Sequence, residues 1–280
     1  MLFSDYFCIF VAKIVMKISV ITINYNNCNG LQATIESVIS QTCSDFEFIV
    51  IDGGSTDGSA DVIKKYSEHI AYWVSEKDSG IYNAMNKGVS HAHGGYCIFI
   101  NSGDCFYSPD VLEIVVGKGL LSDIVIGKVS IDDKDNIISP PPIGELTFYH
   151  LYAGAIPHQG SFIKTELLRN HPYDESLKIS SDWKFFVQAI ILDNCSVTYI
   201  DDFVAKYDMT GLSTENPELM RKEKETVLAE MFPARVLADY QRMKLSECTI
   251  QLLTPELRRH GQIDRFLYRI GKCMLRFFNR

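Results

Sequence analysis

Three acidic residues occupy positions at which a carboxylate can take part in chemistry. Asp52 follows an apolar run and precedes two glycines, and Asp104 ends a short polar segment behind a second apolar run. Asp182 follows two serines, in the first turn of an expected helix. A carboxylate can accept a hydrogen bond from a nucleobase N–H, hold a divalent cation or take a proton from a hydroxyl. These three residues are therefore candidates for pyrimidine recognition, metal binding and general-base catalysis, in that order.

Each of these positions also has a structural interpretation that involves no ligand. The segment Asp52–Gly58 has the composition of a tight turn between a strand and a helix, in which Ser55 or Asp57 caps the helix. Asn101–Asp104 has the composition of a polar turn, and Asp182 is placed to interact with a helix dipole. The glycine fingerprint G-x-G-x-x-G does not occur, which argues against a dinucleotide-binding oxidoreductase.

The elements expected around these residues alternate between strand and helix. We expect strands over Lys17–Asn24, Phe46–Ile51, Ile70–Val74 and Tyr96–Ile100, and helices over Leu31–Ser40, Ser59–Tyr66 and Ser79–Gly88, the last closed by its glycine. Such short connections predict right-handed crossovers and a parallel sheet. Ligands of open α/β sheets bind beyond the carboxyl ends of the strands, which is where Asp52 and Asp104 are expected.

The second half of the chain is more mixed. We expect strands over Asp123–Val129, Ser161–Ile163 and Val197–Ile200, helices over Thr165–Arg169 and Ser181–Leu192, and helix from Asn216 to the end, broken by Pro233 and Pro255.

From Lys17 to about Ser213, the chain resembles the family 2 glycosyltransferases of GT-A fold. The matching segments are Ile18–Asn26, Ser37–Thr42, Asp52–Gly58, Gly80–Gly88, Asn101–Asp104, His158-Gln159 and Ser181–Trp183. The resemblance implies an α/β fold with a Rossmann-like, mostly parallel central sheet flanked by helices. It also implies inverting transfer, in which a base activates the acceptor hydroxyl and Mn²⁺ or Mg²⁺ neutralises the leaving diphosphate.

The resemblance also assigns roles to individual residues. Asp182 corresponds to the catalytic base and Asp104 to the last acid of the metal motif. The residues that correspond to the donor site are Thr22, Asn24, Tyr25, Asp52, Gly54, Asp78, Gly80, Asn83, Asn86, Lys87, Ser102 and Gly103. His158, Gln159 and Trp183 correspond to the acceptor or diphosphate side, although a structural role for His158 is an equal alternative.

Three positions depart from the family pattern. Gly53 stands where the family often has a second acid, and Ser181 stands where it often has Glu. The metal motif commonly carries two acids, whereas Ser102-Gly103-Asp104 retains one. The resemblance therefore leaves a single carboxylate to anchor the metal ion.

We expect an inverting hexosyl- or N-acetylhexosaminyl-transferase that moves a sugar from a UDP-sugar to a hydroxyl of a glycan or lipid-linked acceptor, in cell-surface polysaccharide synthesis. The alternatives are a non-catalytic nucleotide-sugar-binding protein and a sugar-nucleotidyltransferase. We divide the chain into an extension over residues 1–15, a catalytic domain over 16–214 and a helical C-terminal extension over 215–280. Within the catalytic domain, residues 16–104 form the nucleotide-binding half and residues 105–214 the acceptor-binding half.

Charge and cysteine content indicate where the protein works. The net charge of −8 argues against nucleic acid as a partner. Residues 258–280, however, hold seven Arg or Lys side chains against one Asp, interleaved with apolar residues at helical spacing. A basic amphipathic helix of this kind can lie in an anionic membrane surface. The alternative is a helix that packs on the body of the protein with its charged face in solvent. The eight cysteines include no C-x-x-C pair, which favours reduced thiols. We therefore expect a cytoplasmic protein, peripheral on the inner face of the cell membrane.

Overall fold

The computed structural model describes residues 18–131, 136–138, 144–209 and 216–259, with side chains up to residue 246. The chain divides into two compact units, Met1–Glu225 and Thr226–Arg280. The division falls inside helix α10 (Pro217–Met231), so the first turns of this helix belong to the first unit.

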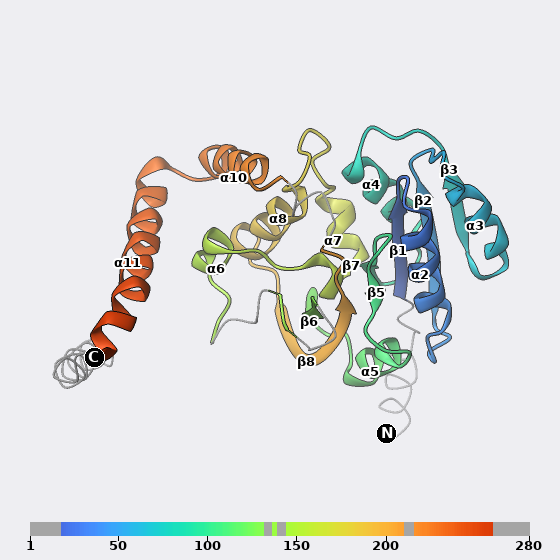
Figure 1. Ribbon diagram of the computed structural model, residues 1–280, viewed down its shortest axis with the longest axis horizontal. Helices are drawn as coiled ribbons and strands as arrows, with labels where there is room; N and C mark the ends of the chain where they lie inside the picture. Colours follow the sequence, from blue (N-terminus) through green and yellow to red (C-terminus); the bar gives the residue numbers. More distant parts are fainter. Residues whose placement is uncertain (1–17, 132–135, 139–143, 210–215, 260–280) are drawn as a thin grey trace, which may run out of the picture. The chain divides into compact units, whose positions relative to one another are not determined.

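An eight-stranded sheet forms the centre of the first unit, in the order β3-β2-β1-β4-β7-β6-β8-β5 (Figure 1). The strands are β1 (Ile18–Asn24), β2 (Phe46–Asp52), β3 (Tyr72–Ser75), β4 (Tyr96–Phe99), β5 (Cys105–Phe106), β6 (Ile124–Ser130), β7 (Ser161–Lys164) and β8 (Val197–Lys206). The first four are parallel, as the sequence predicts. β7 runs antiparallel to both β4 and β6, β8 runs parallel to β6, and β5 runs antiparallel to β8.

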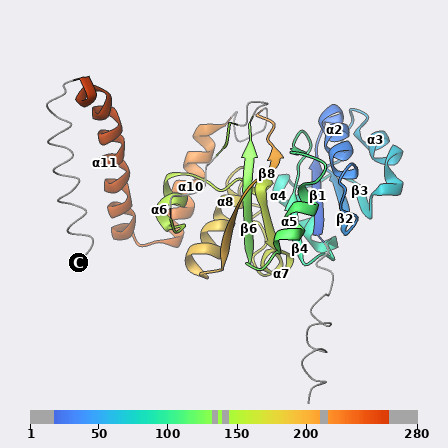
Figure 2. The ribbon, with the colours of Figure 1, turned by 90° about the horizontal axis from the view of Figure 1, so that it is seen from below.

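Helices lie against the sheet and connect its strands (Figure 2). They are α2 (Cys28–Ile39), α3 (Ser59–Lys65), α4 (Ile81–His91), α5 (Val111–Lys118), α6 (Phe148–Ala153), α7 (Thr165–Asn170) and α8 (Ser181–Phe186), which continues as a π-helical turn over Val187–Leu192. Two short 3₁₀ helices, η1 (Ser67–His69) and η2 (His158–Gly160), also lie in the described part of the first unit. All seven residues of β1 are buried, which explains why this central strand is a β-branched run rather than an alternating one.

The predicted end of α4 at Gly88 is wrong, because the helix continues to His91. Gly88 is a packing residue inside the helix: a Cβ atom there would lie 2.5 Å from Cγ2 of Ile21 in β1. The glycine therefore allows α4 to approach the sheet closely instead of closing the helix.

The structure corrects two expectations about the second half and confirms a third. β8 extends to Lys206, well past the predicted Ile200, and its last two residues pair with β5, which the sequence did not indicate. The predicted break at Pro233 is confirmed, since α10 ends at Met231 and α11 (Ala234–Arg259) begins after it. α11 continues through Pro255, where a break was predicted. A proline removes one hydrogen bond from a helix, and here the helix persists without it.

None of the described helices is long and apolar enough to span a membrane. The predicted basic amphipathic tail begins at the last two residues of α11 and otherwise lies outside the described residues.

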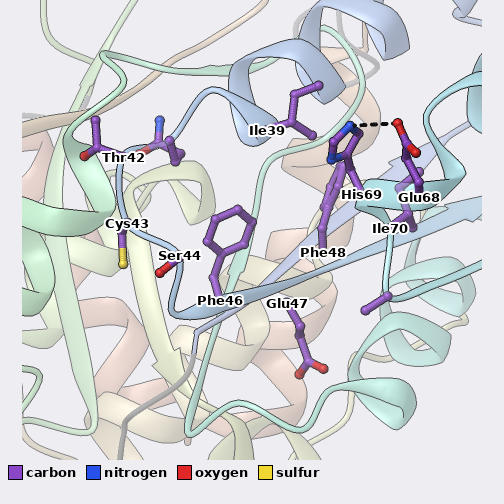
Figure 3. Close-up of a pocket in the computed structure, with 12 residues that line it drawn as sticks. Ile39, Thr42, Cys43, Ser44, Phe46, Glu47, Phe48, Glu68, His69 and Ile70 are labelled. Carbon is purple, nitrogen blue, oxygen red and sulfur yellow. Dashed lines mark ion pairs between the residues drawn. The ribbon is translucent and has the colours of Figure 1, made fainter.

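Glu47 is a buried carboxylate in β2, beside a pocket of ≈ 460 Å³ at the amino ends of the strands (Figure 3). Its Oε1 accepts hydrogen bonds from Ser19 Oγ at 2.6 Å, from the amide of His93 at 2.5 Å and from the amide of Gly94 at 2.9 Å. Burial raises the pKa of Glu47, but these hydrogen bonds together outweigh burial and lower it. Glu47 therefore ties the turn before β4 to β1 and β2.

Glu47→Gln is expected to lower the free energy of unfolding by about 1–2 kcal/mol at neutral pH, because an amide oxygen is a weaker acceptor than a carboxylate. Folding lowers the pKa of Glu47, so its stabilisation is present above the unfolded pKa of about 4.3 and is lost as the pH falls through the folded value. The difference between the variant and the wild type should therefore shrink below about pH 4. Urea unfolding at several pH values measures it.

Glu68→Gln is the matched control, since Glu68 is exposed and pairs with the exposed His69 in the same pocket (Figure 3). Its free energy of unfolding should stay close to that of the wild type at every pH. Equal losses in the two variants would mean that the hydrogen bonds to Glu47 contribute nothing specific.

Candidate active site

The carboxyl edge of the parallel strands collects the residues singled out in the sequence. β1 ends at Asn24 and β2 at Asp52, which are partners in the sheet register. Asp104 follows β4 on the other side of β1. Because β7 runs antiparallel to β4, the residues before β7 also lie at this edge, and they include His158. The pocket of Figure 3 lies at the opposite ends of the strands, so it is separate from this site.

Asp182, at the start of α8, is held by three hydrogen bonds. Its Oδ2 lies 2.8 Å from Nδ1 of His158, and its Oδ1 accepts from the hydroxyl of Tyr82 at 3.0 Å and from the amide of Trp183 at 2.9 Å. Burial raises the pKa of Asp182, but the hydrogen bond and positive charge of His158 outweigh it and lower the pKa. The carboxylate is therefore ionised, and Oδ2 retains a lone pair that a further donor can use.

His158 connects Asp182 to the segment behind β4. Its Nε2 lies 3.1 Å from the side-chain nitrogen of Asn101. Burial lowers the pKa of His158, but the hydrogen bond and charge of Asp182 outweigh it and raise the pKa. The Oδ1 atom of Asn101 is buried and has no hydrogen-bond partner in the described part of the chain. In the present orientation the amide nitrogen of Asn101 can donate to Nε2 of neutral His158. If the amide is turned over, Oδ1 can instead accept from the Nε2–H of protonated His158.

Asp104 has a second acid beside it. The amide of Asp208 donates to Oδ1 of Asp104 at 2.8 Å. Burial raises the pKa of Asp104 to about 6, and the negative charge of Asp208 contributes to the rise, against hydrogen bonds from the Asp208 amide and Gln159. Gly103, with φ +105°, leaves room for this arrangement, because a Cβ atom there would lie 2.5 Å from Oδ2 of Asp208.

These two carboxylates fit a divalent cation. A buried carboxylate with a second acid beside it carries an energetic cost that a cation would relieve, and carboxylate oxygens are the ligands that Mg²⁺ and Mn²⁺ prefer. Among the described residues, no group of three or more His, Cys, Asp and Glu side chains is arranged to hold a metal. A cation at Asp104 and Asp208 would therefore take its remaining ligands from water or from a bound diphosphate.

On the predicted nucleoside side, the side chain of Asp52 is fully engaged by the protein. Its two oxygens accept four hydrogen bonds: from Asn24 Nδ2 at 2.7 Å, Ser55 Oγ at 2.6 Å, Ser55 N at 3.0 Å and Ser75 Oγ at 2.6 Å. Thr22 likewise donates to the carbonyl of Ile100 at 2.6 Å inside the sheet. In this conformation, Asp52 and Thr22 hold the strand ends together.

Three further predicted donor residues, Tyr25, Gly54 and Asp78, lie at the same edge. The side chain of Tyr25 is 68% exposed. A Cβ atom on Gly53 would lie 2.5 Å from Oδ2 of Asp78 and 3.3 Å from Cδ2 of Tyr25. The glycine that replaces the second acid of the family therefore makes room for the carboxylate of Asp78. Gly54, at φ +78°, turns the chain close to the backbone of Lys77.

The predicted donor residues of α4 all have protein partners. Asn83 donates to Glu175 at 2.9 Å, and Asn86 forms a reciprocal pair with the backbone of Tyr173 through hydrogen bonds of 2.9 Å. Lys87 pairs with Glu76 at 2.8 Å. The carboxylate of Glu175 also accepts from Asn86 at 3.0 Å. These contacts fasten the segment before α8 to α4.

The remaining predicted residues contribute backbone hydrogen bonds at the site or pack beneath it. Gly80 precedes α4, and its amide donates to Asp78 at 3.0 Å. The backbone of Ser102 bonds to Ile23 and to the side chain of Asn27. The ring of Trp183 is buried and donates to the carbonyl of Leu151 at 2.8 Å.

The sequence interpretation missed three residues at the site. Asp208 follows a strand whose end was placed too early, so its position beside Asp104 was not evident. Tyr82 contacts Asp182 across 100 positions of sequence. Asn101 was noted only as part of the segment Asn101–Asp104, without a role of its own, although it contacts His158.

This sheet, with its acids at the carboxyl edge of the parallel strands, is that of a glycosyltransferase of GT-A fold. The chain belongs to Glycosyl transferase family 2, whose family model matches residues 19–162. An uncharacterized glycosyltransferase of Mycobacterium tuberculosis (strain H37Rv) is 35% identical over 206 residues, which are 70% of this chain and 77% of that protein. A PGL/p-HBAD biosynthesis glycosyltransferase of Mycobacterium bovis is 28% identical over 210 residues, 69% of this chain and 77% of that protein.

Solved structures agree on the fold. S. aureus TarS 1-349 in complex with UDP-GlcNAc matches with a TM-score of 0.61 and 19% identity, over 77% of this chain and 66% of that chain. A longer TarS chain matches over 43% of its length, with a TM-score of 0.60. Glucosyl-3-phosphoglycerate synthase from Mycobacterium tuberculosis, in complex with Mn²⁺, UDP and glucosyl-3-phosphoglycerate, matches with a TM-score of 0.53 and 20% identity, over 78% of this chain and 81% of that chain.

Proposed function

We propose that this protein transfers a sugar from a UDP-sugar to a hydroxyl of a glycan or lipid-linked acceptor, with inversion at the anomeric carbon. The observation that carries the proposal is the ionised carboxylate of Asp182 on the same edge of the sheet as Asp104 and Asp208, with His158 between the two sides. An inverting transfer needs a base on the acceptor side and a cation site on the diphosphate side.

In the proposed reaction, Oδ2 of Asp182 takes the proton of the acceptor hydroxyl while the acceptor oxygen attacks the anomeric carbon. The new C–O bond forms as the bond to the diphosphate breaks, and the nucleoside diphosphate leaves with the bonding electron pair. Tyr82 and His158 hold the carboxylate in place through both of its oxygens. A bound Mn²⁺ or Mg²⁺ supplies positive charge against the leaving diphosphate, and Asp104 and Asp208 are the side chains that would hold it.

The uridine donor is supported by the structural neighbours, since TarS 1-349 was solved with UDP-GlcNAc and glucosyl-3-phosphoglycerate synthase with UDP and Mn²⁺. A glycolipid or surface-polysaccharide acceptor is supported by the PGL/p-HBAD biosynthesis glycosyltransferase among the relatives. The basic residues within 258–280 support docking at an anionic membrane, where such an acceptor would reside.

A panel of nucleotide-sugars, tested for thermal stabilisation with and without Mn²⁺, identifies the donor. A true donor at 100 times its Kd adds about 2.7 kcal/mol to the free energy of unfolding. UDP-sugars should raise Tm more than GDP-mannose does, and Mn²⁺ should increase the rise.

The stabilising sugar is then offered to acceptor candidates, and UDP release is measured. UDP release with Mn²⁺ supports transfer. Stabilisation without any UDP release would favour a non-catalytic nucleotide-sugar-binding protein. Stabilisation by UTP and a sugar phosphate, with release of pyrophosphate, would favour a nucleotidyltransferase.

A further inference from the structure

Glu223, in the part of α10 that belongs to the first unit, binds the main chain just before the helix that carries Asp182. Its Oε1 accepts from the amide of Lys178 at 2.7 Å, and its Oε2 accepts from the amides of Ile179 and Ser180, each at 3.0 Å. Three consecutive backbone N–H groups thus point at one carboxylate. Such a concave row of amides is a binding site for an anion, and here the protein supplies the anion itself.

This carboxylate binds the main chain at the entry to α8, where no side chain caps the helix. Ser180 is the N-cap residue of α8, but its side chain makes no capping hydrogen bond. Its hydroxyl instead lies 3.4 Å from the carbonyl of Met220 in α10. Unsatisfied amides at the start of a helix need an acceptor, and a negative charge there also interacts favourably with the helix dipole. Of the amides that Glu223 binds, that of Ser180 belongs to the N-cap residue, 43 positions earlier in the chain. The negative charge of Glu223 therefore lies at the start of α8.

The next residue, Lys224, contacts the segment that leads to His158 and the residue that follows Asp182. Its Nζ donates to the carbonyl of Gly154 at 3.1 Å and lies 4.9 Å from the centre of the Trp183 ring. Gly154 ends α6, shortly before His158, and Trp183 follows Asp182 directly. Two consecutive residues of α10 therefore fix the chain on both sides of the contact between Asp182 and His158.

We propose that Glu223 is a positioning residue for sugar transfer, which keeps Asp182 in register with His158 and Tyr82 by fixing the amides of residues 178–180. The proposal rests on the proposed role of Asp182 as the base. It extends the catalytic machinery into α10, beyond the catalytic domain that the sequence delimits at residue 214. Both carboxylate oxygens of Glu223 accept from these amides, so we expect its effect in the rate of the chemical step and not in donor binding.

Glu223→Gln tests this proposal, because it places an amide N–H₂ against backbone N–H groups while preserving size. We expect kcat for UDP release with acceptor to fall by at least about 10-fold, since a small misplacement of a catalytic group has effects of this order. The KM for the nucleotide-sugar and the Mn²⁺-dependent rise in Tm should change by less than about two-fold. Hydrogen exchange of amides 178–180 should accelerate by at least about 10-fold.

Glu225→Gln is the matched control on the same helix, since Glu225 is exposed and pairs with Arg221 at 2.7 Å. It should leave kcat and amide exchange unchanged. Glu223→Asp retains the charge on a shorter side chain, and its kcat should lie between those of the wild type and Glu223→Gln. This second variant serves also if Glu223→Gln does not fold.

Two results would overturn the proposal while leaving the proposed function intact. One is wild-type kcat in Glu223→Gln and Glu223→Asp, from a wild type that transfers sugar. The other is a rise in KM with unchanged kcat, which would make Glu223 a donor-side structural residue. A wild type that releases no UDP with any donor and acceptor would instead refute the proposed function itself.

Discussion

Asp182→Asn is expected to lower kcat for sugar transfer by about 10³-fold, the loss typical of removing a general base. The affinity for the nucleotide-sugar should remain within about two-fold of the wild type, because Asp182 acts on the acceptor hydroxyl. An asparagine side chain has nearly the same shape and can still accept hydrogen bonds from Tyr82 and Trp183, but it cannot take a proton. UDP release with acceptor measures the rate, and calorimetry with the donor measures the affinity.

Asp193→Asn provides the control, since Asp193 follows the π-helical turn behind α8 and pairs with His171 at 3.0 Å, away from the site. It should transfer sugar at nearly the wild-type rate. If Asp182→Asn releases UDP as fast as the wild type in the presence of acceptor, Asp182 is not the base. The ion pair with His158 would then be structural, which is the alternative left open by the position of Asp182 in the first turn of a helix.

The parallel half of the sheet could be predicted from the sequence because its signals are local. β1, β2 and β4 are rich in β-branched and aromatic residues, and each is followed by a polar segment that had to lie at the carboxyl edge. This geometry places Asp52 and Asp104 at the ends of the two strands that flank β1, without knowledge of any distant contact. The order of the family motifs then added Asp182, which lies far from both in the sequence.

The roles within the site depend on contacts between distant residues, which local patterns do not contain. Asp52 was assigned to the nucleobase, but the sequence could not show that Asn24, Ser55 and Ser75 donate to its carboxylate. Asn86 was assigned to the donor site, whereas its amide pairs with the backbone of Tyr173, 87 positions away. A sequence pattern shows that a polar side chain is near an edge, but burial and partners decide which of its atoms remain available to a ligand.

Asp208 is a residue of the site that local sequence patterns did not indicate. The metal motif was expected to hold a single acid, Asp104, because only adjacent residues were compared. The second carboxylate arrives through β8, whose end the sequence placed too early, and lies 104 positions away in the chain.

Asp104→Asn and Asp208→Asn are each expected to abolish Mn²⁺ binding at the site. Removing a residue that only supports a metal ligand lowers the affinity by ~10–100-fold, and removing a direct ligand should lower it further. Burial and the charge of Asp208 raise the pKa of Asp104 to about 6, so the two acids are held together at a cost that a cation offsets. Removing either acid removes half of the negative charge that these two side chains offer to the ion. Titration of Mn²⁺ in the presence of UDP, followed by electron paramagnetic resonance, measures the affinity independently of turnover.

Asp201→Asn is the control. Asp201 is an exposed acid in the middle of β8, seven positions before Asp208 in the chain, and it pairs with Lys128. Its Mn²⁺ affinity should equal that of the wild type.

The comparison of the two site variants decides how many acids anchor the metal. If Asp104→Asn loses Mn²⁺ while Asp208→Asn binds it as the wild type does, the motif works with the single carboxylate that the sequence indicates, and Asp208 contributes only the backbone amide that it donates to Asp104. Loss in both variants would mean that β8 supplies the acid that the metal motif lacks.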